Sequence, residues 1–249
     1  VQGNNPDGTP NLDYPVLIDI PNLIDYMLII LYGGNLDAPI SNFIRNNNPN
    51  NFFSVRNRNQ REGFKSFVHD AEHTLLNVNQ DRTGPWPAGN QFPQSNPQRI
   101  WQQLSANAEF RLQVADHVHR HFFNGGVLSV EGATSLFDKR IAQIDRAVVG
   151  ESARWGDAKR SAPFTRDNAW LAEVNNVRKN SLPRRTEIVL KQLRNDNLYP
   201  SITAPEYNQH GGTVPDGFKL KMTATSGDMY YTTDGSDPRV RFAGSILPL

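Results

Sequence analysis

The densest cluster of ionisable side chains lies in the stretch GFKSFVHDAEHTLLN, residues 63–77. Within it, His69, Glu72 and His73 fit the H-x-x-E-H pattern, in which two histidines hold zinc and the glutamate is the general base. Such a site needs its three residues on one helix, because residues one turn apart point the same way. The alternating apolar residues of 64–68 predict a strand before His69 instead. A zinc hydrolase built on these three residues is therefore kept as an alternative.

The same stretch also fits a phosphotransfer site. The predicted strand would deliver Asp70 to its end, where a carboxylate could hold Mg²⁺ on a nucleotide. Upstream, Asp37 lies in a loop after an apolar helical stretch, Asn42 follows it, and Asn51 comes directly before a first short strand. Protein kinases show the same order of catalytic-loop aspartate, asparagine, two-stranded ribbon and metal-binding aspartate.

Five segments resemble one known family when taken in order. They are NLIDYMLIILYGGNLDAPISN, NNFFSVRNR, GFKSFVHDAEHTLL, DHVHRHFFNGG and RTEIVLKQLRNDNLYP. Together they resemble the spore-coat CotH kinases, an atypical branch of the protein-kinase-like fold found in large multidomain bacterial proteins, over about residues 12–200. The resemblance implies transfer of the γ-phosphate of ATP to protein Ser/Thr hydroxyls, with Mg²⁺ or Mn²⁺ as the metal.

The resemblance also assigns roles to individual residues. Asp37 resembles the catalytic aspartate that orients the acceptor hydroxyl, and Asp70 the metal-binding aspartate. Glu72 stands where the family often has a second aspartate, which is a departure from its pattern. Asn42 has the kinase spacing from Asp37, whereas Asn51 has the position at the strand, so both remain candidate ligands of the metal and nucleotide. We expect Asp37 and Asp70 to converge on one cleft beside the ribbon.

Other parts of a kinase are not evident in this chain. A Gly-rich loop and a strand lysine lie before the catalytic loop in kinases, but no lysine precedes Lys65 here. We therefore expect a fragment that corresponds to a C-terminal lobe and is inactive, or nearly so, by itself. A non-catalytic surface or scaffold protein, in which a kinase-like body only binds partners, is the alternative from another class.

Composition bounds the partners. The 249 residues carry 26 Lys+Arg and 25 Asp+Glu, a net charge of +1, so no strong field favours nucleic acid. The apolar run 23–32 is interrupted by Asp25 and is shorter than the roughly 20 residues that span a bilayer, so we expect no membrane span. Without cysteine, a metal must be held by oxygen or imidazole.

His117, His119 and His121 alternate on a predicted helix, and only His117 and His121 share a face. We interpret the three as satisfied surface histidines.

The chain is predicted to be α+β: a mainly helical, protein-kinase-like C-lobe with a small β-ribbon, followed by a partial β-sandwich. Periodicity predicts helices over 19–32, 96–123, 129–155, 165–180 and 183–196, and strands over 52–55 and 64–68. A Pro/Gly-rich stretch separates a body of residues 1–203 from a module of residues 204–249, with strands over 218–223 and 228–233. Its segment YYTTDGSDPR resembles the chitobiase or β-hexosaminidase C-terminal module of secreted bacterial proteins, which implies a secreted or cell-surface location.

Overall fold

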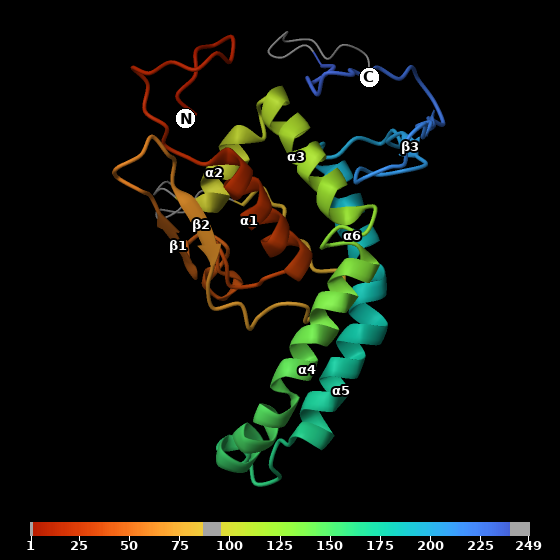
Figure 1. Ribbon diagram of the computed structural model, residues 1–249. Helices are drawn as coiled ribbons and strands as arrows, with labels where there is room; N and C mark the ends of the chain where they lie inside the picture. Colours follow the sequence, from red (N-terminus) through yellow and green to blue (C-terminus); the bar gives the residue numbers. More distant parts are fainter. Residues whose placement is uncertain (1, 87–95, 240–249) are drawn as a thin grey trace.

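The computed structural model describes residues 2–86 and 96–239 and is an α+β arrangement of helices with two small antiparallel sheets (Figure 1). Its α-helices are α1 (Ile20–Gly33), α2 (Pro97–Leu104), α3 (Ala108–Phe122), α4 (Val130–Trp155), α5 (Leu171–Asn176) and α6 (Leu182–Asn195). A short 3₁₀ helix, η1 (Asn42–Ile44), and two π-helical segments, η2 (Arg166–Trp170) and η3 (Val177–Ser181), complete the helical elements. The strands are β1 (Phe52–Val55), β2 (Lys65–Val68), β3 (Glu206–Tyr207) and β4 (Met222–Thr223).

Helix α1 forms the centre of the core. The Asp19 side chain accepts a hydrogen bond from the backbone of Asn22 at 3.0 Å and begins the helix, and Gly34, with a φ of 59°, ends it. The helix contacts α2, α3, α6 and β2. Its buried residues are Ile20, Leu23, Ile24, Tyr26, Met27, Leu28, Ile30, Leu31 and Tyr32. The sequence-based expectation of a buried helix over 19–32 is confirmed.

The predicted ribbon is confirmed by the antiparallel pairing of β1 with β2, in which Phe52 lies opposite Val68. The ribbon is joined to α1 through Asn22, whose side-chain oxygen accepts from the backbone N–H of Ser66 at 2.6 Å. The amide nitrogen of the same side chain donates to the Ser66 carbonyl at 3.3 Å. An asparagine on a helix surface thus satisfies both backbone groups of a strand residue.

Two predicted helix boundaries are wrong. The helix expected over 96–123 is broken into α2 and α3, because the Asn107 side chain accepts from Phe110 N at 3.0 Å and starts a new helix. The separate helices expected over 165–180 and 183–196 are instead one helical stretch from η2 through α6. Pro183, which cannot donate a backbone hydrogen bond, lies in the first turn of α6, directly after the wider turn of η3.

Helix α4 and the segments η2, α5 and η3 run side by side away from the rest of the body (Figure 1), and α6 continues this arm back into the core. Within α4, the buried residue is Ala133. Ion pairs link the two arms, with Arg166 and Asp145 at 2.7 Å and Arg178 and Asp138 at 2.6 Å. The opposite arm buries Val174 and Val177, so this long helical hairpin combines apolar packing with these ion pairs.

The segment after residue 203 is largely exposed. Its ribbon consists of the two-residue strands β3 and β4, so the strand expected over 218–223 is shortened, and residues 228–233 are not a strand. Asn208 supplements the ribbon, accepting from Lys221 N at 2.8 Å and donating to Lys219 O at 3.1 Å. The alternation of apolar and polar residues did not produce longer strands, because this segment has few apolar side chains to bury. Residues 240–249 of the expected module lie outside the described residues.

Within the described parts of the chain, no helix is both long and apolar enough to cross a membrane.

Candidate functional site

Asp37 lies in the turn that follows α1. Its backbone N–H donates to the Asn35 side chain at 2.8 Å, which fixes the turn. Its carboxylate Oδ1 accepts a hydrogen bond from Ser41 Oγ, and its Oδ2 accepts from Asn51 Nδ2 at 2.9 Å. The half-buried carboxylate is thus held at both oxygens, by a residue of its own loop and by a residue that directly precedes β1.

Asn51 and Asp70 occupy the same end of the ribbon. Asn51 comes before Phe52 and Asp70 follows Val68 by two residues, and Phe52 and Val68 are paired. Both have a positive φ, 47° for Asn51 and 50° for Asp70, a conformation that asparagine and aspartate tolerate better than most residues. Asp70 is exposed at this position.

The segment after Asp70 runs beside the segment that leads to Asp37. The backbone N–H of Leu36 donates to His73 O at 3.1 Å, and that of Leu75 donates to Gly33 O at 2.7 Å. The loop after α1 and the loop after β2 are therefore joined by backbone hydrogen bonds at the same end of the ribbon.

The two remaining candidates for this site are placed differently. Asn42 is exposed in η1, and its side-chain oxygen accepts from Asn46 Nδ2 at 3.2 Å. Glu72 is exposed, with Oε1 3.3 Å from His73 Nε2. Of the two asparagines that the sequence left open, Asn51 is the one that contacts Asp37.

The helix that an H-x-x-E-H zinc site requires is not formed, because residues 69–73 are irregular. The His69 ring packs edge-on against Phe53, with ring centroids 5.9 Å apart. The His73 ring packs against Phe43, with centroids 4.7 Å apart. The two imidazoles thus pack against different aromatic rings.

Arg82 anchors the loop that carries Asp37 and was not identified from the sequence. Its buried guanidinium donates to Ile40 O and, at 2.7 Å, to Asn46 Oδ1. Burial lowers its pKa to about 10, and the negative charges of Asp37 and Asp81 oppose that shift. Since Arg82 follows an irregular stretch, no periodic pattern could have indicated its role.

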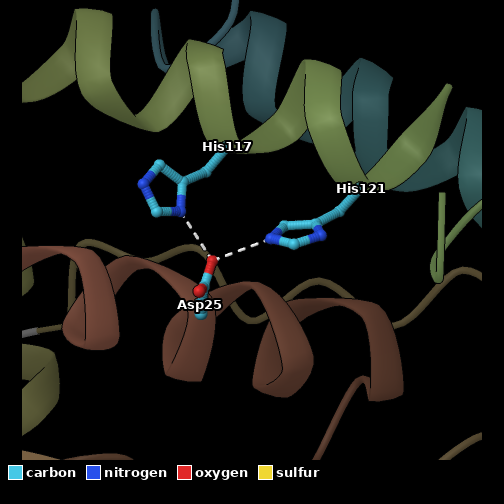
Figure 2. A group of neighbouring side chains, drawn as sticks. All are labelled: Asp25, His117 and His121. Carbon is cyan, nitrogen blue, oxygen red and sulfur yellow. Dashed lines mark hydrogen bonds and ion pairs between the residues drawn. The ribbon is translucent and has the colours of Figure 1, made fainter. Parts of the chain in front are cut away.

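A second polar cluster joins α1 to α3 (Figure 2). Asp25 Oδ1 lies 2.6 Å from His117 Nδ1 and 2.9 Å from His121 Nε2. His117 and His121 are satisfied, as the sequence predicted, but by a carboxylate of a neighbouring helix, and the His117 side chain is only 12% exposed rather than at the surface. For His119 the prediction is wrong, because among the described residues its buried Nδ1 has no hydrogen-bond partner. The signals in the sequence were the i, i+4 spacing of the histidines and the single charge in the apolar run of α1.

The chain matches no protein-family model, and neither curated proteins nor solved structures gave a match. The arrangement of its own residues is therefore what bears on its function.

Proposed function

We propose that the chain is the body of a CotH-type, kinase-like phosphotransferase that acts on protein Ser/Thr hydroxyls. In this proposal Asp37 orients the acceptor hydroxyl, while Asp70 and Asn51 hold Mg²⁺ or Mn²⁺ on ATP. The observation that carries it is the 2.9 Å hydrogen bond from Asn51 Nδ2 to Asp37 Oδ2. That bond ties the loop after α1 to the start of β1, whose partner strand leads to Asp70.

The chemistry of these side chains suits the roles. Asn51 donates through its amide nitrogen, which leaves its carbonyl oxygen for a hard cation, and such oxygen ligands are those that Mg²⁺ prefers. Asp70 is exposed at the same end of the ribbon, where its carboxylate is open to a metal held by a nucleotide. Each oxygen of Asp37 already accepts one hydrogen bond but has a further lone pair for an incoming hydroxyl.

Kinase catalysis depends on fixed positions of these groups, since misplacement of a reacting group reduces the rate steeply. Ser41 and Asn51 restrain the Asp37 carboxylate, and Arg82 holds its loop through Ile40 and Asn46. The same proposal takes residues 204–249 as an accessory module similar to the chitobiase C-terminal type, in a protein that is secreted or at the surface of a bacterium.

Paramagnetic broadening of amide NMR signals by Mn·ATP tests the site, because it detects weak binding. We expect broadening centred on Asp37, Asn51 and Asp70 that requires the nucleotide. Asp70→Asn should weaken it by about tenfold or more, equivalent to about 1.4 kcal/mol, while Asp37→Asn should leave it nearly unchanged, because Asp37 serves the acceptor.

Glu62→Gln is the matched control, since Glu62 precedes β2 at the other end of the ribbon and pairs with Lys65 at 3.3 Å. It should bind Mn·ATP as the unmodified chain does. An absence of any broadening would favour the non-catalytic scaffold, and broadening that Asp70→Asn leaves intact would refute the assignment. Zn²⁺ held by His69 and His73 would favour the hydrolase alternative.

A further inference from the structure

We propose that Asp25, His117 and His121 form a binding site for one late first-row divalent ion, foremost Zn²⁺, that joins α1 to α3. Among the described residues, these three are the group of histidine and carboxylate side chains whose ligand atoms all lie within 4.8 Å of one another. The site lies on helices other than the loop and ribbon of Asp37, so it does not depend on the function proposed above.

The two helices place the ligands before any ion arrives. His117 and His121 lie one turn apart on α3 and point the same way, toward Asp25 of α1 (Figure 2). Val114 and Val118 of α3 are fully buried in the core that α1 also enters. Because the packed core fixes the distance between the helices, the three side chains remain close without a metal.

The distances are near those of a metal site. Zinc binds imidazole nitrogen and carboxylate oxygen at about 2.0–2.2 Å, so ligand atoms in a tetrahedral site are about 3.3 Å apart. Here the two nitrogen–oxygen separations are 2.6 and 2.9 Å. A widening of roughly half an ångström, within reach of small side-chain rotations, would admit the ion. Three protein ligands would leave a fourth position for water.

The type and exposure of the ligands select the ion. Two imidazoles with one carboxylate favour Zn²⁺ and its neighbours in the first transition row over Mg²⁺ or Ca²⁺, which prefer oxygen. The side chains are 12%, 22% and 43% exposed for His117, His121 and Asp25, so solvent can deliver an ion to them. Binding would replace the hydrogen bonds to Asp25 by bonds from neutral imidazoles to the metal.

Calorimetric titration of the metal-free chain, made without a histidine tag, with Zn²⁺ tests the proposal. We expect one Zn²⁺ per chain with a Kd of about 10 μM or tighter. The double variant His117→Asn/His121→Asn should bind at least about 100-fold more weakly, and Asp25→Asn at least about tenfold, because each loses ligand atoms. Mg²⁺ should not bind there.

His119→Gln is the matched control, since His119 lies on the same helix but stacks on Phe123, with ring centroids 5.1 Å apart. It should keep its Zn²⁺ affinity within about twofold, since it supplies no ligand. If circular dichroism shows that the double variant does not fold, the more exposed single variant His121→Gln decides, with an expected loss of at least about tenfold.

Three results would overturn the site. They are an unmodified chain that binds no Zn²⁺ at up to about 1 mM, a folded ligand variant that binds as tightly as the unmodified chain, and, without nucleotide, Mg²⁺ binding of equal strength that the double variant loses. The second result would place the ion elsewhere, for instance on His69 and His73.

Discussion

The guanidinium of Arg185 links α6 to the end of α1, and its replacement by methionine should strongly destabilise the protein. Arg185 is fully buried. Its Nε donates to Tyr32 O at 2.7 Å, its Nη2 to Leu31 O at 2.5 Å and its Nη1 to Val78 O at 2.6 Å. Two of these carbonyls belong to the last turn of α1, where carbonyls lack partners within the helix. Leu31 O also accepts from the backbone N–H of the capping Gly34 at 3.2 Å. The loop that carries Asp37 begins directly after this end of α1.

The magnitude follows from these contacts. A hydrogen bond to a charged group contributes about 1.5–3 kcal/mol, so three together give a gross contribution of about 4.5–9 kcal/mol. Burial of the charge opposes this and lowers the pKa of Arg185 to about 10. Methionine keeps most of the apolar stem, so the cavity that it leaves is small. We expect Arg185→Met to lower the free energy of unfolding by about 3–5 kcal/mol, because each carbonyl left buried without a partner costs about 1–3 kcal/mol.

Urea unfolding at neutral pH, followed by circular dichroism, measures this loss. The matched control is Arg184→Met, because Arg184 is exposed on the same helix and, among the described residues, donates only to Asn180 O, at 2.8 Å. Its cost should be below about 0.5 kcal/mol. A loss below about 1 kcal/mol for Arg185→Met would mean that water or other groups satisfy the three carbonyls, and would refute the reasoning.

Two further predictions concern α4 and α3. A Cβ at Gly132 would lie 2.1 Å from the Gly126 carbonyl oxygen, whereas one at Gly150 would meet nothing within 4 Å; Gly132→Ala should therefore lower the urea midpoint, and Gly150→Ala should raise stability by about 0.5–1 kcal/mol. Equal changes of the urea midpoint in Gly132→Ala and Gly150→Ala would contradict a clash at Gly132. Burial lowers the pKa of His119 below its ordinary 6.5, so the fold favours the neutral ring and loses stability as the pH falls below about 6.5. His119→Gln should lessen the fall of the urea midpoint between about pH 7 and 5. An unchanged fall would mean that protonation of His119 does not contribute to the loss of stability.

Local signals in the sequence predicted much of the fold. The limits of α1 follow from the Asp19 cap and the stop at Gly33 and Gly34, and the Ser129 cap starts α4 where it was expected. The alternating apolar residues gave the β1–β2 ribbon. Each of these signals acts over a few residues, through side-chain caps, backbone preferences and the period of apolar positions. Where two local signals competed, as at Asn107 or Pro183, the boundaries were not predictable.

The tertiary structure alone decided which distant residues touch. Nothing in the pattern of the chain pairs Arg82 with Ile40 or Arg185 with the end of α1. The pattern marks Asp25 and the two histidines as separate signals on two helices, and only the packing of α1 on α3 brings them together. The order of residues left both Asn42 and Asn51 as candidates for the amide ligand of the metal. In the structure the position of Asn51 directly before β1 brings its side chain into contact with Asp37. Such contacts depend on how packed helices and strands are placed in three dimensions, because each buried polar group must find its partner within hydrogen-bonding distance wherever the core leaves it.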